Sequence, residues 1–321
     1  MKRQPKVSII LPTYNQEKFI GNAIKSALLQ GYDNVEILVR DDSSTDSTYV
    51  VAQELAQNYP TKVFVKRNSK NLGITANCNK LLDDVTGEFL ICSAGDDEIV
   101  SGRIQAQLEF FCSHTDAILC NSAVEIREHS SQGYLGTYID KDFTRSNFSI
   151  GKIIRQPNQA NGARFMINWT KANHLRYDTR TPVVSDWLFW NELLYYGTVG
   201  TIQKSGLIYT RNEQSVTSAG IEKTYLADRL IATDIYLDKY MTHYYSLRIQ
   251  RSHIFYFAAK RYAFAKSYKT SLKLTLFSIS EHPFYFSKAW VLLIVIPIIF
   301  FGFREHHWTK MKKIKNSIKK R

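Results

Sequence analysis

The first hundred residues alternate between short apolar runs and amphipathic stretches. Residues 7–11, 35–39, 63–65 and 88–92 predict buried strands, because each run is rich in branched and aromatic side chains and ends at a polar turn. Between these runs, apolar residues recur at helical spacing over 17–30, 47–58 and 75–82, with Asn15 able to cap the first helix. This alternation predicts an α/β fold, a Rossmann-like and mostly parallel sheet covered by helices.

The pattern changes in the second half of the chain. A helix is expected over 100–112 and a further strand over 117–119, followed by a polar, irregular stretch over 127–161 that we interpret as substrate-facing loops. Helical spacing returns over 186–196, a short hairpin is expected over 199–209, and helices dominate 223–277. We therefore expect three regions, with bounds at 1–125, 126–220 and 221–321.

The last region contains an uncharged apolar segment, residues 289–303. Its 15 residues are fewer than the roughly 20 that a membrane-spanning helix needs. Seven basic residues between Lys310 and Arg321 follow it, and such a cluster beside an apolar helix is typical of binding to anionic headgroups. We expect interfacial or re-entrant insertion, and a buried core helix with a basic tail is the alternative.

Charge strengthens this distinction between the two ends of the chain. Residues 241–321 hold 16 Lys/Arg and 2 Asp/Glu, whereas residues 1–240 hold 26 and 27. A polycationic tail indicates a polyanionic partner, and the adjoining apolar segment favours an anionic membrane over nucleic acid. The four cysteines form no CxxC or Cys/His cluster, so neither a zinc site nor a disulfide framework is expected. No signal peptide is evident at Met1, which makes the cytoplasm the expected compartment.

The candidate chemistry lies at the predicted strand ends. Asp41-Asp42 follows the second strand and Asp96-Asp97 follows the fourth. Carboxylates at the carboxyl edge of a parallel sheet are suited to hold a nucleotide and its metal ion.

Several motifs in order resemble the nucleotide-binding half of family 2 glycosyltransferases, which have the GT-A fold. They are residues 7–15 (VSIILPTYN), 41–46 (DDSSTD), 71–73 (NLG) with Ala76 and Asn77, 87–90 (GEFL) followed by Asp96-Asp97, and Arg103. The resemblance covers about the first 125 residues and then, locally, Asp186. It implies that residues 1–125 bind the nucleotide sugar and that 126–220 bind the acceptor and carry the base, whereas the membrane association expected of 221–321 comes from its charge and apolar segment.

The resemblance also implies roles for individual residues. Asp96 matches the acid that binds Mn²⁺ or Mg²⁺, although Ala94 stands where the family commonly has another acid. Asp42 matches the residue that hydrogen-bonds uracil, whereas we expect Asp46 to cap the following helix. The donor-binding positions implied are Pro12, Thr13, Tyr14, Asn15, Asp42, Asn71, Gly95, Asp97 and Arg211.

Two positions have an ordinary structural interpretation as well. Asp186 matches the family's catalytic base, but an acid at a helix start also caps N–H groups. Arg211 could bind phosphate in a bidentate manner, or it could be a surface arginine in its loop. Asn212 follows it where the family often has a histidine.

The expected function is therefore an inverting glycosyltransferase. It would move a sugar from a nucleotide-diphosphate donor, expected to be a UDP-sugar, to a glycan or lipid-linked acceptor in bacterial surface polysaccharide synthesis (capsule, O-antigen or similar), at the cytoplasmic side of the cell membrane. A nucleotidyltransferase is the first alternative, but residues 12–17 contain no glycine-rich phosphate loop. A non-catalytic nucleotide-sugar-binding protein of the same fold is the second, and Ala94 supports it. A dinucleotide oxidoreductase is disfavoured because no GxGxxG occurs.

Overall fold

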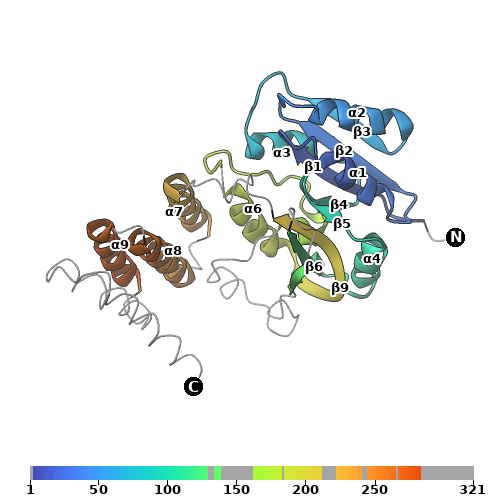
Figure 1. Cartoon of the computed structure of the whole chain (residues 1–321). Helices are drawn as coiled ribbons and strands as arrows, with labels where there is room; N and C mark the ends of the chain where they lie inside the picture. The colour runs from blue at the N-terminus through green and yellow to red at the C-terminus, as the bar shows by residue number, and fades with distance from the viewer. Residues whose placement is uncertain are drawn as a thin grey trace. The chain divides into compact units, whose positions relative to one another are not determined.

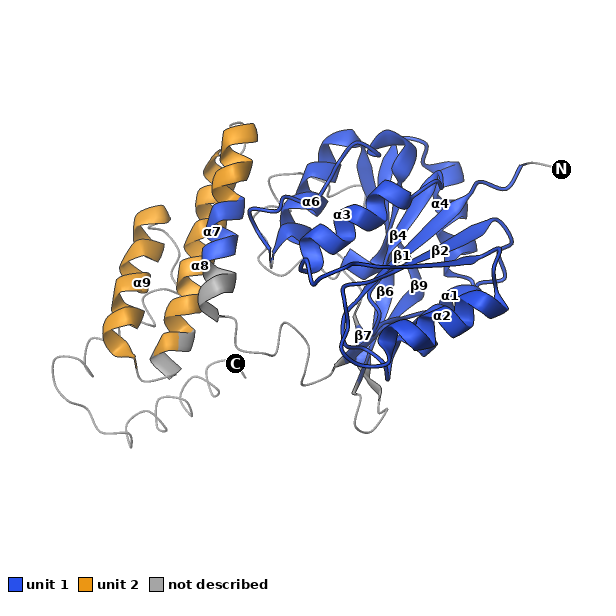
Figure 2. Cartoon of the chain, turned by 90° about the horizontal axis from the view of Figure 1, so that it is seen from above, with its two compact units in different colours: residues 1–153, 158–232 blue, residues 154–157, 233–321 orange. Residues whose placement is uncertain are grey.

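A computed structural model describes residues 3–128, 134–138, 162–182, 184–211, 222–240, 244–264 and 267–282. The chain divides into two compact units, residues 1–153 with 158–232 and residues 154–157 with 233–321 (Figure 2). Unit 1 holds the described strands and the helices that cover them (Figure 1). The expected regions 1–125 and 126–220 both contribute to unit 1, since β6 (Ala117–Glu128) runs across the expected boundary.

Unit 1 is built on one mixed sheet with the strand order β3-β2-β1-β4-β8-β6-β9-β5, and β7 pairs with β6 beside this path. The first four strands are parallel, as the alternating pattern predicts, and β6 is parallel to β9. The remaining four pairings are antiparallel. The expectation of a mostly parallel sheet is therefore wrong for the second half of the fold. The other strands are β1 Val7–Thr13, β2 Val35–Asp41, β3 Val63–Arg67, β4 Phe89–Cys92, β5 Glu98–Ile99, β7 Tyr134–Tyr138, β8 Phe165–Asn168 and β9 Thr198–Arg211.

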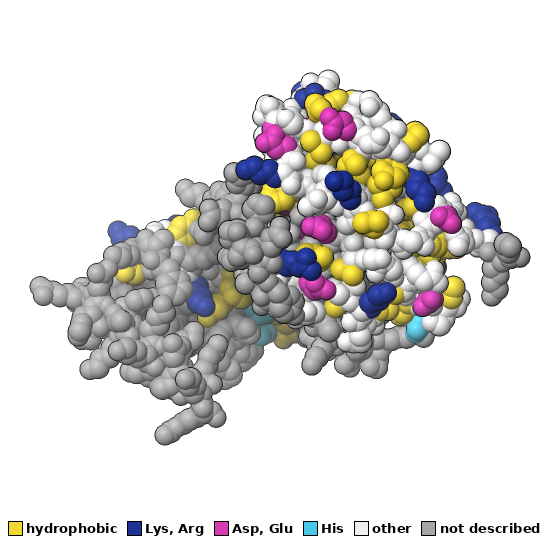
Figure 3. Space-filling model, turned by 45° about the vertical axis from the view of Figure 1, so that its right-hand side comes forward, with side chains coloured by type: hydrophobic (Ala, Val, Ile, Leu, Met, Phe, Trp, Pro, Cys, Tyr) yellow, Lys and Arg dark blue, Asp and Glu magenta, His cyan; other side chains and the backbone are white. Residues whose placement is uncertain are grey.

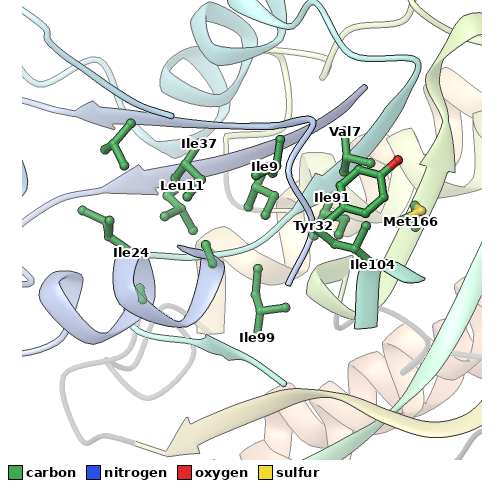
Figure 4. Close-up of a cluster of buried hydrophobic side chains, with 14 of the residues drawn as sticks. Val7, Ile9, Leu11, Ile24, Tyr32, Ile37, Ile91, Ile99, Ile104 and Met166 are labelled. Carbon is green, nitrogen blue, oxygen red and sulfur yellow. The ribbon is translucent and has the colours of Figure 1, made fainter. Parts of the chain in front are cut away.

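Helices cover both faces of the parallel strands. Val7, Ile9 and Leu11 of β1 pack in one buried cluster with α1, α2 and α4, part of which Figure 4 shows. Ile10 points to the other face and packs in a second cluster with α3 and α6, because successive side chains of a strand alternate between its two faces. These clusters hold the carboxyl ends of the strands in place from both sides. The helices are α1 Ile20–Leu28, α2 Thr48–Asn58, α3 Ile74–Asp84, α4 Arg103–Ser113 and α6 Ser185–Leu193.

Three local expectations are wrong. The stretch 127–161 is not irregular throughout, because β7 pairs with the outer part of β6. The expected hairpin over 199–209 is one long strand, β9, paired with β6 on one side and β5 on the other. Asn15 does not cap α1, which begins at Ile20. Its side chain instead accepts a hydrogen bond from the backbone N–H of Thr45 (2.9 Å).

Unit 2 contains the end of α7 (Glu222–Lys239) and the antiparallel pair α8 (Tyr244–Phe264) and α9 (Tyr268–Glu281). This agrees with the helical pattern expected over 223–277. Arg251 ties the three helices together, since its guanidinium contacts Asp234 of α7 and, at 3.0 Å, Glu281 of α9.

Within the described residues, no helix combines the length and the apolar character needed to cross a membrane. The apolar segment 289–303 and the basic residues after it lie outside the described ranges, so the membrane-associating region stays a prediction. On the described surface seen in Figure 3, acidic and basic side chains are interspersed, which fits the near-neutral balance of residues 1–240.

Candidate functional site

The loops after β1, β2 and β4 meet at the carboxyl edge of the parallel strands. The backbone N–H of Asp42 donates to the carbonyl of Thr13 (2.9 Å), and that of Gly95 donates to the carbonyl of Pro12 (3.2 Å). The end of β1 therefore carries the loops of both acidic doublets. Pro12 and Thr13 are themselves buried, so they offer backbone to this edge and not side chains.

The turn after β1 exposes an aromatic ring. Tyr14 is 44% exposed. Asn15 and Ser43 both adopt positive φ angles (51° and 64°), and the Ser44 hydroxyl accepts from the backbone N–H of Asn15 at 2.9 Å. These contacts fix the turn after β1 to the turn after β2. Tyr14 therefore lies on a loop that these contacts hold in place, and its role toward the nucleotide stays a prediction.

The first acidic doublet is buried and fully engaged within the protein. Asp41 accepts hydrogen bonds from the backbone N–H and hydroxyl of Ser44, and it forms an ion pair with Arg67 (3.1 Å). Such buried carboxylates are stable only when donors surround them. Asp41 therefore anchors the turn that follows β2.

Asp42 ties this strand end to the start of α3. Its carboxylate accepts from the side-chain N–H of Asn68 (2.8 Å) and from the backbone N–H groups of Leu72 (2.9 Å) and Gly73 (2.8 Å). Asn71 contributes a further acceptor to the N–H of Gly73 (3.0 Å). With these donors in place Asp42 has little acceptor capacity left. Its role toward uracil stays a prediction, and that of Asn71 does as well.

The second doublet lies on a tight turn after β4. Gly95 is required there by close packing, because a Cβ atom at this position would lie 2.7 Å from Oγ1 of Thr13 and 2.3 Å from Oε1 of Gln16. Asp96 is partly exposed, whereas Asp97 is only 4% exposed. The turn thus presents Asp96 at the sheet edge and turns Asp97 inward.

Asp97 is the most perturbed acid of this edge. Burial and the neighbouring charge of Asp96 raise its pKa well above the ordinary value, and a hydrogen bond from the backbone of Thr210 and the charge of Arg103 oppose them. Its Oδ1 atom is buried without a hydrogen-bond partner among the described residues. Two adjacent carboxylates, one with an unused oxygen, are a donor set that suits a hard divalent cation.

The described residues contain no group of three or more His, Cys, Asp or Glu side chains able to hold a metal ion. This does not conflict with the donor set at Asp96-Asp97. Mg²⁺ at nucleotide sites is bound by one or two carboxylates, and the phosphates of the substrate supply further ligands. Ala94, which is partly buried before the turn, supplies no ligand. The residues therefore fit an ion that binds together with a diphosphate.

Arg103 supports this turn from inside the protein. Its guanidinium is completely buried and donates to Oε1 of Gln107 (2.8 Å) and to the carbonyls of Gly206 (3.2 Å) and Phe165 (3.0 Å). Burial lowers its pKa to about 10, so it stays charged at neutral pH. Arg103 therefore joins α4 to β8 and β9 beneath the carboxylate of Asp97.

Asp186 lies in the first turn of α6 and is partly buried. Its Oδ1 accepts from the backbone N–H of Trp187 (2.7 Å), so the expected helix-start contact is present. Burial raises the pKa of this carboxyl, and the hydrogen bond from Trp187 and the cation of Arg229 on α7 oppose the rise only in part. A raised pKa is typical of a general base or acid, so capping and catalysis remain compatible here.

The structure brings Asp186 to the same edge as Asp42. The hydroxyls of Thr75 on α3 and Ser185 on α6 lie 2.8 Å apart, so the starts of the two helices are in contact. The buried thiol of Cys78 lies within the electrostatic reach of both carboxylates, since each raises its pKa. Asp42 and Asp186, more than a hundred positions apart in sequence, therefore both lie near Cys78.

Sequence reasoning missed the residues that support Asp186. Arg229 is buried, and its guanidinium lies over the Trp187 ring at 5.8 Å. Tyr177 stacks on Phe189 of α6, and its hydroxyl contacts the thiol of Cys92 at the end of β4 (3.8 Å). No local motif marks these residues, because their contacts come from distant elements. Arg211 is the last residue of β9. Its side chain and residues 212–217 lie outside the described part of the chain, so the role of Arg211 toward phosphate stays a prediction.

Comparison with known proteins adds evidence on family and fold. The family model described as glycosyl transferase family 2 matches residues 8–172, just over half of the chain. The GalNAc(5)-diNAcBac-PP-undecaprenol beta-1,3-glucosyltransferase of Campylobacter jejuni is 32% identical over 151 residues, 46% of this chain and 48% of that protein. Chondroitin synthase of Escherichia coli is 39% identical over 77 residues, 24% of this chain and 11% of that protein. The chain thus spans less than half the length of these curated relatives.

Solved structures share the fold at low sequence identity. The crystal structure of S. aureus TarS 1–349 in complex with UDP-GlcNAc has a TM-score of 0.65 and 18% identity, covering 86% of this chain and 81% of that one. The mannosyltransferase PcManGT from Pyrobaculum calidifontis, in complex with GDP-Man and Mn²⁺, has a TM-score of 0.56 and 13% identity, covering 93% and 88%. The motifs, the mixed sheet and the matched family model agree, and the chain belongs to glycosyl transferase family 2.

Proposed function

We propose that this protein is an inverting glycosyltransferase that moves a sugar from a UDP-sugar to a hydroxyl group of a glycan or lipid-linked acceptor, in the synthesis of a bacterial surface polysaccharide. The observation that carries the proposal is the placement of acids at the ends of the parallel strands. Asp42 follows β2 and the Asp96-Asp97 turn follows β4, and the contact between α3 and α6 brings Asp186 near Asp42. Family membership and the nucleotide-sugar ligands of the structural relatives support it.

Each part of the site has a role in this proposal. The donor base lies against Tyr14 and the turns that hold Asp42 and Asn71, and the diphosphate lies beside the Asp96-Asp97 turn and Arg211. Asp96, with Asp97 behind it, would hold Mn²⁺ or Mg²⁺, which offsets the negative charge of the leaving diphosphate.

Asp186 acts as the general base on the acceptor. Its carboxylate takes the proton of the acceptor hydroxyl as that oxygen forms a bond to the anomeric carbon. The bond from the anomeric carbon to the diphosphate oxygen breaks with its electron pair on the diphosphate. Because attack and departure occur on opposite faces of the sugar, the anomeric configuration inverts.

The C-terminal region has a separate role in the proposal. The apolar segment 289–303 and the basic residues that follow would attach the enzyme to the anionic cytoplasmic face of the cell membrane, where a lipid-linked acceptor is found. The support for this part is the charge of residues 241–321, with 16 Lys/Arg against 2 Asp/Glu.

The decisive experiment measures release of UDP from a panel of UDP-sugars, with and without glycan acceptors, in the presence of Mn²⁺. We expect one donor to be turned over by the wild type, with Asp186→Asn reducing turnover about 10²-fold and leaving donor affinity nearly unchanged. Ala94 favours a second candidate, a non-catalytic nucleotide-sugar-binding protein. That candidate predicts UDP-sugar binding by calorimetry with no UDP release from any donor.

A further inference from the structure

α9 packs against α8 through small polar side chains. Ser271, Thr275 and Ser278 are completely buried on its inner face. The hydroxyl of Ser278 donates to the carbonyl of Ser252 and that of Ser271 donates to the carbonyl of Ala259, both at 2.7 Å. Small residues allow two helix backbones to approach closely, and Leu272 and Leu274 pack beside them against the cluster around Ala259 of α8.

The outer side of α9 carries two further large apolar residues that are half exposed. Leu276 is 54% exposed, and Phe277 is 50% exposed although its ring centroid lies 5.5 Å from that of Phe255 on α8. Lys269, Lys273 and Ser280 are exposed on the same side, since positions three and four apart share one face of a helix. We call these five residues the α9 outer face. α9 therefore presents apolar and basic side chains on its outside, in addition to the apolar and polar side chains that pack on α8.

The positive charge of the α9 outer face indicates which kind of partner can bind it. Neither Lys269 nor Lys273 has an ion-pair partner within the described residues, and like charges four apart on a helix repel one another. The nearest acid along α9, Glu281, is already paired with Arg248 (3.2 Å) and Arg251 (3.0 Å). The face therefore offers unpaired cations beside apolar side chains, which is the combination that anionic lipid headgroups and acyl chains bind.

Aromatic residues at the adjoining end of the pair fit the same partner. Tyr244 is 50% exposed and Tyr245 is 63% exposed at the start of α8, and the Tyr245 hydroxyl lies 3.2 Å from Nε2 of His282 just after α9. Tyrosines with a polar tip and an apolar ring are enriched where a protein meets the interface of a membrane.

We propose that the α9 outer face docks on an anionic lipid surface, with Leu276 and Phe277 entering the headgroup layer and Lys269 and Lys273 contacting lipid phosphates. This inference rests on the membrane attachment proposed above and deepens it. Attachment then depends on a folded helix pair as well as on residues 284–321, so the orientation of unit 2 at the membrane is set by its structure.

The test is sedimentation of the full-length protein with vesicles of phosphatidylcholine, with and without about 30% phosphatidylglycerol. The apolar pair Leu276→Ser with Phe277→Ser should lower vesicle binding about tenfold or more at every salt concentration. The charge pair Lys269→Gln with Lys273→Gln should lower binding to anionic vesicles about tenfold at low salt, and the difference should fade as salt screens the charges. Val50→Ser is the matched control, because Val50 is 56% exposed on α2 in unit 1, and it should bind as the wild type does.

Three results would overturn the docking proposal. Vesicle binding unchanged in both pairs would show that the face does not touch lipid. A lower mass by light scattering in the apolar pair, with unchanged vesicle binding, would assign the face to a second copy of the chain. A lower melting temperature of the apolar pair, with unchanged vesicle binding, would show that Leu276 and Phe277 belong to the protein's own hydrophobic core. None of these assays needs catalysis. A failure to release UDP would therefore refute the proposed glycosyl transfer without affecting the proposed docking of the α9 outer face.

Discussion

Replacing Asp186 with Asn separates a catalytic carboxylate from a helix cap, because proton transfer needs the carboxylate whereas the cap needs only an oxygen that accepts a hydrogen bond. In the wild type Oδ1 of Asp186 lies 2.7 Å from the backbone nitrogen of Trp187. The Asn side chain keeps an oxygen that can accept this hydrogen bond, so the cap is preserved. What the substitution removes is a partly buried negative charge near Arg229.

The direction of the pKa shift fixes the sign of the effect. Burial raises the pKa of Asp186 above its value of 3.8 in an unfolded chain, and the hydrogen bond from Trp187 and the charge of Arg229 only partly oppose this. Below pH 3.8 the carboxyl is neutral in both states, so its ionisation does not reduce native stability. As the pH rises from 3.8 through the folded pKa, the unfolded chain loses its proton more readily, and native stability falls. Each unit of the raised pKa corresponds to about 1.4 kcal/mol of native stability lost at neutral pH. Asp186→Asn should recover this loss, so its stability relative to the wild type should rise with pH.

The assay is urea unfolding of both proteins between pH 3 and pH 8. Any cost of burying the amide of Asn is independent of pH, so the slope of the stability difference is the measured quantity. Asp46→Asn is the matched control, because Asp46 also accepts from a helix-start N–H, that of Thr48 (3.0 Å), but its hydrogen bonds lower its pKa. Its carboxylate stabilises the fold above the unfolded pKa, so Asp46→Asn should lose stability relative to the wild type as the pH rises.

The same Asp186→Asn protein should lose about 10²-fold in turnover, which corresponds to about 2.7 kcal/mol of transition-state stabilisation. A stability difference that does not change with pH would contradict the burial argument. Normal turnover would leave Asp186 as a helix cap alone.

Three further outcomes are expected. Asp96→Ala should abolish the Mn²⁺-dependent thermal stabilisation by UDP while the protein stays folded, and wild-type UDP affinity with the same metal dependence would refute its role as metal ligand. Gly95→Ala should weaken UDP binding about tenfold by calorimetry, because its Cβ would lie 3.0 Å from Cβ of Thr13 and displace the turn that presents Asp96; unchanged affinity would show that the turn can shift freely. Deleting residues 284–321 should move the protein from the membrane fraction to the soluble fraction and leave UDP binding intact, and equal sedimentation of both forms with anionic vesicles would refute a role for the tail.

Local sequence pattern is sufficient to predict the parallel half of the sheet. The apolar runs before the two acidic doublets became β2 and β4, and the helical spacing between the runs became α1, α2 and α3. This works because a strand covered on both faces must be apolar throughout, and a covering helix must show an apolar stripe, so burial leaves its pattern in consecutive residues. Since parallel strands end together, the positions of the doublets also predicted the sheet edge.

Sequence pattern failed where pairing is between distant segments. β8 and β9 lie on either side of β6 in the sheet, and the long β9 had been expected as a hairpin. A single strand and a hairpin share the same two-residue alternation, and only the partner strands distinguish them. The choice between a parallel and an antiparallel neighbour is likewise made by the chain path and leaves no local signal.

The candidate site divides in the same way. Sequence alone indicated Asp96 and Asp186 as the acids to consider, Asp96 because an acid after a buried strand is unusual for packing, and both because they match acids of the family. Only the tertiary structure decided that Asp42 is occupied by three donors, that Asp97 turns inward, and that Arg229 faces Asp186. Hydrogen-bond saturation, burial and opposing charge are properties of the space around a side chain, and that space is filled by residues that the folded chain brings from elsewhere.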